Sequence, residues 1–432
     1  MKKTVSLCII AKDAEDTLTN CLRSVSGLVN DIVLIDTGST DKTKYIAADF
    51  DARIFDFKWN DNFSSARNFS LSKIVSDWVL ILDSDEILVG TKEQLEMLIN
   101  QDFGDEIPMY FIDIFTYIKN AEKPEYVYYQ KKIRLFPRHS NVFFKNSVYE
   151  EMVHPNGTEN MLGLSANGIV IKHFLKDGPK SKSKRNALIL RKELKKNPGD
   201  FLYNYLMGKE YLQYGYYDKA LTYYRNSLES EEEKEKLILS EICTDIIKIL
   251  YRKGDLEEAL NECIRREGLC KDNPEYWLNY GFLALKQGDL ECAKKSLETC
   301  LELTPPAHSI TFKISNLTWK PELLLGYIFL RMGDNENAKT SFERALKYNP
   351  GNWLLLFYLG IVCKNLKDFN SSEIYFNEAS GLVPEEFKKD LQFSFLLVHI
   401  MNGKFEKANE LVKSMVDAFI NPEEMELLDE AF

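Results

Sequence analysis

The chain changes its hydrophobic pattern near the middle. In residues 1–197, short apolar runs such as those at 31–35 and 79–82 end in small or acidic residues and are followed by stretches with helical spacing. In residues 198–432 the strand-like runs disappear and apolar positions recur at helical spacing. The pattern therefore predicts an α/β domain that ends in a connecting helix, followed by an all-α domain.

The α/β domain is expected to contain a mostly parallel sheet. Residues 4–11 and 31–35 predict two buried strands, and the helical spacing of apolar residues in 16–29 predicts a helix between them. Further strands are expected at 52–57 and 79–82. Because strands and helices alternate along the chain, these strands should run parallel to one another.

The second part of this domain, from residue 107 on, has alternating rather than unbroken apolar runs. Residues 107–145 are rich in Tyr, Phe and Ile in alternating positions, which predicts strands that complete a mixed sheet. An apolar run at 169–172 predicts one more strand, and residues 180–196 predict the connecting helix. Between the two parts, residues 86–100 contain a helical pattern.

Two predicted strands end in carboxylates. Asp36 follows the second strand, and Asp83 and Asp85 follow the strand at 79–82. Parallel order brings both ends to one edge, where ligands bind in open α/β sheets. Two carboxylates spaced i, i+2 can hold a hard divalent cation against a diphosphate, and Asp36 can accept hydrogen bonds from a base or ribose. The alternative is that these acidic residues cap the helix expected at 86–100.

A third candidate is Arg67, which lies in the segment WNDNFSSARN that opens a helix between the two acidic strand ends. A guanidinium group near a helix start could reach a phosphate or a uracil base. The alternative is a surface salt bridge, which is the commoner role for an arginine.

In chain order, VSLCIIAKDAEDTLTNCLRSV, IDTGSTDKT, WNDNFSSARN and ILDSDE resemble the motifs of family 2 glycosyltransferases, which have a GT-A nucleotide-sugar-binding domain. The resemblance covers roughly the first 195 residues. It implies transfer of a sugar from a nucleotide diphosphate donor, expected to be a UDP-sugar, with inversion at the anomeric carbon.

The resemblance also implies roles for individual residues. Asp36 and Arg67 would contact the uridine, Asp83 the ribose, and Asp85 a Mg²⁺ or Mn²⁺ ion. Thr37 stands where some relatives have a second Asp, which changes the expected contact with the base. The whole set expected to bind the nucleotide sugar is Ala11, Asp36, Thr37, Arg67, Asp83 and Ser84.

The candidates for the catalytic base are Glu150 and Glu151. An inverting displacement needs a base that takes the acceptor's proton, placed opposite the departing diphosphate. Related enzymes commonly read V-H-E at this place, so Glu150 aligns with the Glu and Tyr149 replaces the His. The alternative is that the Glu-Glu pair is a solvated turn.

His173 follows the strand expected at 169–172. Taken alone, such a histidine is more often a structural hydrogen-bonding residue than a ligand. The family resemblance includes a His that precedes an Arg-Asn pair, so His173 is expected to complete the metal or diphosphate site, and Lys184 and Arg185 to offset the diphosphate charge. The basic residues could equally be the solvated face of the connecting helix, and both readings can hold together.

The second domain shows a repeat of about 34 residues, the period of tetratricopeptide arrays. Small residues such as Gly281 and Ala293 should let the two helices of one repeat approach closely. Additional residues at 305–319 lengthen one connection and could form a protruding loop. The clearest copy has Trp277, Tyr280, Gly281, Ala284, Gly288, Ala293, Leu297, Cys300 and Pro305.

Composition narrows the class of protein. The net charge of -11 argues against a general affinity for nucleic acid or anionic membranes. The eight cysteines contain no C-x-x-C pair and suggest reduced core residues. No stretch approaches the roughly 18 apolar residues that a membrane span needs, so a cytoplasmic chain without a membrane span is expected.

KNSVYEEM and HFLKDGPKSKSKRN resemble segments of bacterial peptide S-glycosyltransferases of glycosylated bacteriocins, the sublancin type. This resemblance implies transfer of a sugar, expected to be glucose, to a Cys or Ser side chain of a peptide docked by the repeats. The concave side of a solenoid suits an extended peptide or a second copy of the chain, so a homodimer through the repeats is a further expectation. The alternatives are a glycosyltransferase acting on a cell-envelope saccharide and a non-catalytic nucleotide-binding adapter.

Overall fold

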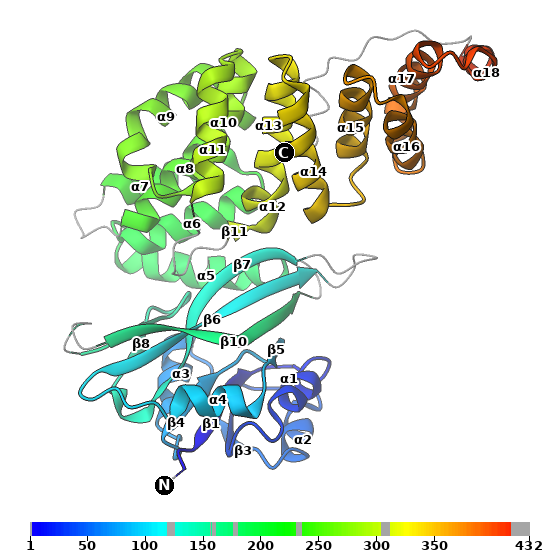
Figure 1. Cartoon of the computed structure of the whole chain (residues 1–432). Coiled ribbons are helices and arrows are strands. Elements are labelled where there is room, and N and C mark those ends of the chain that lie inside the picture. The colour runs from blue at the N-terminus through cyan, green and yellow to red at the C-terminus, as the bar shows by residue number, and fades with distance from the viewer. Residues whose placement is uncertain are drawn as a thin grey trace. The chain divides into compact units, whose positions relative to one another are not determined.

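The computed structural model describes residues 2–118, 126–155, 157, 161–175, 180–229, 236–303 and 312–415. By its internal contacts the chain divides into two compact units, residues 1–235 with 307–313 and residues 236–306 with 314–432 (Figure 1). Each unit is described by itself. None of the described helices is long and apolar enough to cross a membrane.

The first unit is built on a sheet that has nine strands in the described part of the chain, in the order β3-β2-β1-β4-β7-β6-β10-β5, with β11 paired to β7. β1 to β4 run parallel, as predicted, and β7 is antiparallel to both β4 and β6. The strands are β1 (Val5–Ala11), β2 (Asp31–Asp36), β3 (Arg53–Asp56), β4 (Trp78–Ile81), β5 (Glu86–Val89), β6 (Ile107–Ile118), β7 (Tyr126–Pro137), β10 (Met161–Leu175) and β11 (Phe312–Lys313).

Both faces of the parallel strands are covered, which explains their unbroken apolar sequences. On β1, Leu7 and Ile9 pack in one core with Leu18, whereas Cys8 faces a second core that includes Ile81. The helices that follow these strands are α1 (Leu18–Val25), α2 (Thr43–Ala48), α3 (Phe63–Leu71) and α4 (Lys92–Ile99).

The helix expected at 86–100 begins later than predicted. Residues Glu86–Val89 form β5, which pairs antiparallel with β10. The helix starts only after Thr91, whose hydroxyl accepts from the backbone of Gln94 while the Gln94 side chain accepts from the backbone N–H of Thr91. The acidic residues at 83–86 therefore do not cap a helix. Glu86 is instead the first residue of β5, and its side chain is buried.

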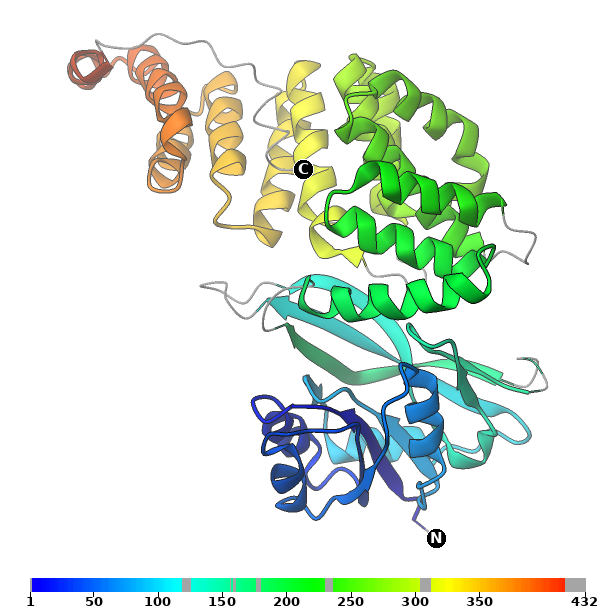
Figure 2. The ribbon, with the colours of Figure 1, turned by 180° about the vertical axis from the view of Figure 1, so that it is seen from behind.

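A small hairpin and three helices complete the first unit. The hairpin joins β8 (Phe143–Lys145) to β9 (Glu151–Val153), after a 3₁₀ turn at Arg138–Ser140. The helices are α5 (Lys180–Lys196), α6 (Phe201–Gln213) and α7 (Tyr217–Glu229). In Figures 1 and 2, α5 lies between the long strands of the sheet and α6. The compact unit thus continues past residue 197, where the sequence pattern changes.

The second unit consists of antiparallel helices, consistent with the predicted repeats (Figure 2). Glycines show how the helices of a pair approach. A Cβ on Gly326 would lie 2.6 Å from the ring of Phe342, and a Cβ on Gly360 would lie 2.3 Å from the ring of Phe376. Gly281 lies equally close to Leu297, and in the first unit Gly208 of α6 lies equally close to Tyr224. The helices are α8 (Lys236–Arg252), α9 (Leu256–Cys270), α10 (Pro274–Gln287), α11 (Leu290–Glu302), α12 (Ile314–Leu317), α13 (Trp319–Arg331), α14 (Asn335–Tyr348), α15 (Trp353–Asn365), α16 (Phe369–Ser380), α17 (Lys388–Met401) and α18 (Phe405–Met415), with a 3₁₀ turn at Glu385–Phe387.

The long connection at 305–319 is more than a loop. Residues 304–311 lie outside the described part of the chain. After them, Phe312 and Lys313 form β11, which pairs antiparallel with Tyr129 and Tyr128 of β7. A segment between two repeat helices therefore supplies a short strand to the sheet of the first unit.

Candidate functional site

The ends of β1 and β2 form the first part of the site. The two strands are in register, with Ala11 opposite Asp36. The backbone N–H and the hydroxyl of Thr37 both donate to the Ala11 carbonyl, at 3.0 and 3.1 Å. The Asp36 carboxylate is 1% exposed and accepts from the backbone N–H groups of Gly38 and Ser39, each at 3.1 Å. Asp36 therefore stabilises the turn that follows its own strand.

The end of β4 carries a network of charges, in which Arg134 and Glu86 are buried and the Asp83 side chain is 42% exposed. Arg134, on β7, donates to Glu86 at 2.6 Å and lies 3.5 Å from the second oxygen of Asp83. The backbone N–H of Asp83 donates to Glu86 at 2.8 Å. Because Glu86 is 1% exposed, burial raises its pKa, and the guanidinium of Arg134 opposes that change.

Arg67 connects this network to a distant part of the sequence. One of its terminal nitrogens pairs with Asp83, and its Nε donates to Oε1 of Glu150 at 3.2 Å. Although burial disfavours a charged guanidinium, the carboxylates of Asp83 and Glu150 raise the pKa of Arg67. The second terminal nitrogen, Nη1, is buried and has no hydrogen-bond partner among the described residues. This nitrogen remains available to donate to a ligand.

The two acidic candidates at the hairpin have different surroundings. Glu150 ends the loop between β8 and β9, is 21% exposed and faces Arg67. Glu151 is the first residue of β9, is 54% exposed and pairs with Lys145 at 3.1 Å, its partner across the hairpin. The structure thus brings Glu150, and not Glu151, to the network around Asp83.

Asp85 and His173 form a second group at the same edge of the sheet. Ser84 and Asp85 make the turn between β4 and β5, and His173 lies on β10 opposite Glu86. His173 Nε2 is 3.4 Å from the Asp85 carboxylate, and its Nδ1 is 3.4 Å from the hydroxyl of Thr116. Within the described residues, three or more His, Cys, Asp or Glu side chains do not gather in a metal-binding group.

This pair fits a divalent cation that keeps other ligands. Mg²⁺ is usually held by one or two protein carboxylates together with substrate phosphates and water, and Mn²⁺ shares its preference for oxygen ligands. Asp85 supplies a carboxylate and His173 a ring nitrogen, so the remaining positions would be filled by diphosphate oxygens and water.

The basic residues of α5 differ in their surroundings. The Arg185 guanidinium lies 4.7 Å from the ring centroid of Phe63 on α3. Partial loss of water lowers the pKa of Arg185, and the charges of Glu150, Tyr149 and Asp83 act in the opposite direction. Lys184 is exposed on the same helix.

Sequence reasoning missed three charged residues of this site. Arg134 and Glu86 are buried in it, and Lys132 lies two residues before Arg134 on β7. Desolvation and the charge of Arg134 lower the pKa of Lys132, while Glu150, Asp83 and Glu86 oppose that change. The alternation in QKKIRLF could have placed Lys132 and Arg134 on one face of a strand. It could not have shown that this strand lies beside β4.

Comparisons with known proteins agree with this architecture. Residues 6–154 match the profile of glycosyl transferase family 2, and residues 274–306 and 323–386 match tetratricopeptide repeat profiles. The solved structure of Pseudomonas aeruginosa PilF is 15% identical, covers 50% of this chain and 90% of its own, and has a TM-score of 0.39.

Two curated relatives carry the comparison further. A TPR repeat-containing protein of Synechococcus elongatus is 27% identical over 306 residues, which is 69% of this chain and 66% of that protein. The SPbeta prophage-derived glycosyltransferase SunS of Bacillus subtilis is 26% identical over 234 residues, 52% of this chain and 53% of that protein. The chain thus spans between about half and two thirds of the length of these relatives. Its α/β domain belongs to glycosyl transferase family 2, and its helical part is a tetratricopeptide-repeat array.

Proposed function

We propose that this chain is a metal-dependent inverting glycosyltransferase, which moves a sugar from a UDP-sugar to a Cys or Ser side chain of a peptide. The observation that carries the proposal is the position of Arg67 between Asp83 and Glu150. One guanidinium there connects the edge of the sheet where nucleotides bind to a carboxylate on a separate hairpin.

Asp83, Arg67 and Asp36 are proposed to hold the nucleoside part of the donor. The buried Nη1 of Arg67 is a donor that a base or phosphate oxygen would satisfy, since a buried unpaired N–H costs stability. Ala11, Thr37 and Ser84 would supply backbone and hydroxyl groups around it. Asp36 would accept a hydrogen bond from the base in addition to those that it accepts from the backbone N–H groups of Gly38 and Ser39.

Asp85 and His173 would hold the metal ion, which supplies positive charge to the diphosphate as the leaving group departs. Arg185, whose guanidinium lies against the ring of Phe63, would add to that charge, and Lys184 on the same helix is the weaker candidate. Lys132 is a further candidate, because it lies two residues before Arg134 on β7.

Glu150 is the proposed base. It takes the proton from the acceptor thiol or hydroxyl, the sulfur or oxygen bonds to the anomeric carbon, and the bond from that carbon to the diphosphate oxygen breaks. UDP leaves with the electron pair of the broken bond. Arg67 would orient the Glu150 carboxylate, whereas the Glu151 carboxylate pairs with Lys145 across the hairpin. A thiol acceptor, with an ordinary pKa near 8.5, needs less help than a hydroxyl.

The peptide acceptor is proposed from the repeats, since the concave surface of such arrays suits extended chains. Glucose is the expected sugar.

The test uses the full chain with UDP-glucose and Mn²⁺. We expect the chain to release UDP, and Asp85→Asn to lower that release at the same Mn²⁺ concentration. A peptide array with Cys or Ser acceptors should gain one hexose mass per modified peptide. Transfer to saccharides alone would overturn the peptide acceptor. Absence of UDP release with every UDP-sugar tested would overturn the proposed activity.

A further inference from the structure

We infer that α5 and α6 hold the loop that carries Glu150, so that Tyr149 and Glu210 are positioning residues for the reaction. The inference rests on the proposed function, because it assumes that the reaction rate depends on the position of the Glu150 carboxylate. It assigns the first helices after the sheet to the catalytic unit, rather than to acceptor docking alone.

The loop at 146–150 has an unusual backbone. Asn146 and Tyr149 both adopt positive φ angles, 74° and 56°. Asn tolerates this conformation, but in Tyr the side chain makes it unfavourable. Such a residue persists only where its surroundings hold it. Tyr149 directly precedes Glu150, so whatever holds Tyr149 also sets the direction of the proposed base.

Tyr149 is held from α6. Its hydroxyl donates to Oε1 of Glu210 at 3.0 Å, and Glu210 is 5% exposed. Loss of water around the hydroxyl and the Glu210 carboxylate raise the pKa of Tyr149 to about 12, so the phenol keeps its proton and remains a donor. Because 46% of Tyr149 is exposed, the hydrogen bond, more than apolar burial, fixes its position.

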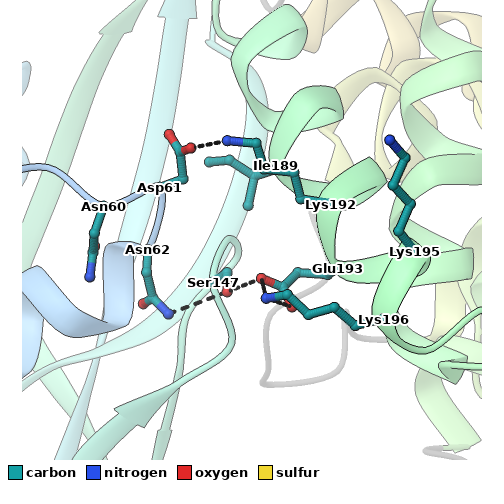
Figure 3. A pocket seen from close by; sticks show the side chains of 9 residues that line it. All are labelled: Asn60, Asp61, Asn62, Ser147, Ile189, Lys192, Glu193, Lys195 and Lys196. Atoms are coloured by element: carbon teal, nitrogen blue, oxygen red, sulfur yellow. Dashed lines mark hydrogen bonds and ion pairs between the residues drawn. The ribbon is translucent and has the colours of Figure 1, made fainter.

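Ser147, in the same loop, is held from both helices. Its backbone N–H donates to the hydroxyl of Tyr203 on α6 at 3.0 Å, and its own hydroxyl donates to Glu193 on α5 at 2.9 Å. Figure 3 shows this second contact beside a pocket of about 440 Å³ lined by α5 and by residues 60–62. In that pocket Asn62 also reaches Ser147, at 3.3 Å, and Lys192 of α5 pairs with Asp61.

On its other side the loop rests on α3. The backbone N–H of Phe63 donates to the Ser147 carbonyl at 2.8 Å, and the Ser64 hydroxyl donates to the Lys145 carbonyl at 2.7 Å. The loop is therefore fixed between α3, which carries Arg67, and α5 with α6. Glu150 lies 3.2 Å from Arg67 in this arrangement, and a displacement of about 1 Å can cost a factor of 100 in rate.

The test measures kcat and KM for UDP-glucose in the full chain, with Mn²⁺ and UDP release as the readout. Tyr149→Phe and Glu210→Ala should each lower kcat by about 10- to 100-fold, with KM changed by less than about threefold. Glu210→Gln should keep most of the activity, since its amide oxygen still accepts the hydrogen bond. The double variant Tyr149→Phe with Glu210→Ala should lose no more than either single variant.

Tyr348→Phe and Glu386→Ala, two exposed positions in the second unit, serve as matched controls and should leave both constants unchanged. Wild-type kcat in Tyr149→Phe and Glu210→Ala, beside an inactive Glu150→Gln, would overturn this inference and leave the proposed function standing. Equal losses in Glu210→Ala and Glu210→Gln would also overturn it, because they would assign Glu210 to stability. Full turnover in Glu150→Gln would overturn the proposed base itself.

Discussion

The Nε of Arg67 donates to Oε1 of Glu150 at 3.2 Å, although the two residues come from a helix and a hairpin loop that are far apart in the sequence. The same guanidinium pairs with Asp83, and the Arg67 side chain is only 6% exposed. Removing either carboxylate would leave the buried guanidinium of Arg67 with one compensating charge fewer. The position of Glu150 is therefore tied to that of Asp83.

This arrangement separates the two acidic candidates. Glu150→Gln should lower UDP release from UDP-glucose at least about 100-fold, because the amide cannot take the acceptor's proton. UDP binding, measured by calorimetry, should persist. Glu151→Gln removes only an exposed pair with Lys145 and should change the rate by less than about threefold. Equal losses in the two variants would contradict the assignment of the base.

Removal of the metal ion should stop the reaction. Dialysis against EDTA is expected to abolish UDP release, and Mn²⁺ or Mg²⁺ should restore it. Asp85→Asn should raise the Mn²⁺ concentration needed for half-maximal activity by at least about tenfold, since it weakens one of the two proposed protein ligands. Asp105→Asn, at an exposed loop position, is the control. Unchanged activity in EDTA would refute metal dependence.

Close helix packing predicts an unusual effect of alanine. Gly360→Ala would place a Cβ 2.3 Å from the ring of Phe376, so the variant should lose about 1–3 kcal/mol and show a lower Tm. Gly268→Ala is the matched control, because Gly268 lies in α9 with nothing within 4 Å of the added atom. Helix propensity alone should stabilise that variant by up to about 1 kcal/mol. A raised Tm in Gly360→Ala would contradict the packing.

One ion cluster in the second unit should make stability depend on pH. Glu373 on α16 pairs with Lys404 and with Lys407, and these contacts lower its pKa from 4.5 to about 2. Because the folded pKa lies below the unfolded one, the contribution is complete above about pH 4.5 and is lost as the pH falls to about 2.

Glu373→Gln should therefore lower the Tm at pH 7, and its difference from the unaltered chain should shrink between about pH 4.5 and 2. Glu386→Gln, at an exposed position, should show no difference at either pH. A Tm difference that stays constant across this range would mean that the effect of the substitution does not come from the charge of Glu373.

The sequence predicted the parallel strands well, because unbroken apolar runs such as 31–35 and 79–82 arise where a strand is covered on both faces. It also predicted the helix pairs from the repeat of about 34 residues and its small residues such as Gly281. The structure adds that Gly326 and Gly360 lie against Phe342 and Phe376. The predicted start of α4 was wrong. The segment EILV suits a strand and a helix equally as long as the strand that pairs with it is unknown.

Contacts between residues far apart in the sequence could not be predicted either, because they depend on which elements pack side by side. Arg134 reaches Glu86 only because β7 returns antiparallel beside β4, a choice of neighbour that local patterns do not encode. Tyr149 was noticed only as a departure from V-H-E, and its contact with Glu210 depends on how α6 packs. The nearness of Glu150 to Arg67 likewise comes from the placement of the hairpin against α3.

The strand β11 has a consequence for engineering this chain. Phe312 and Lys313 pair with β7, yet they lie in sequence between helices of the array, so the polypeptide passes from one compact unit to the other three times. A chimaera that exchanges the array by a single junction after residue 235 would take these two residues away from the sheet. An exchange of the helical array that keeps β11 in the sheet would therefore need two grafted segments, one before and one after this short strand.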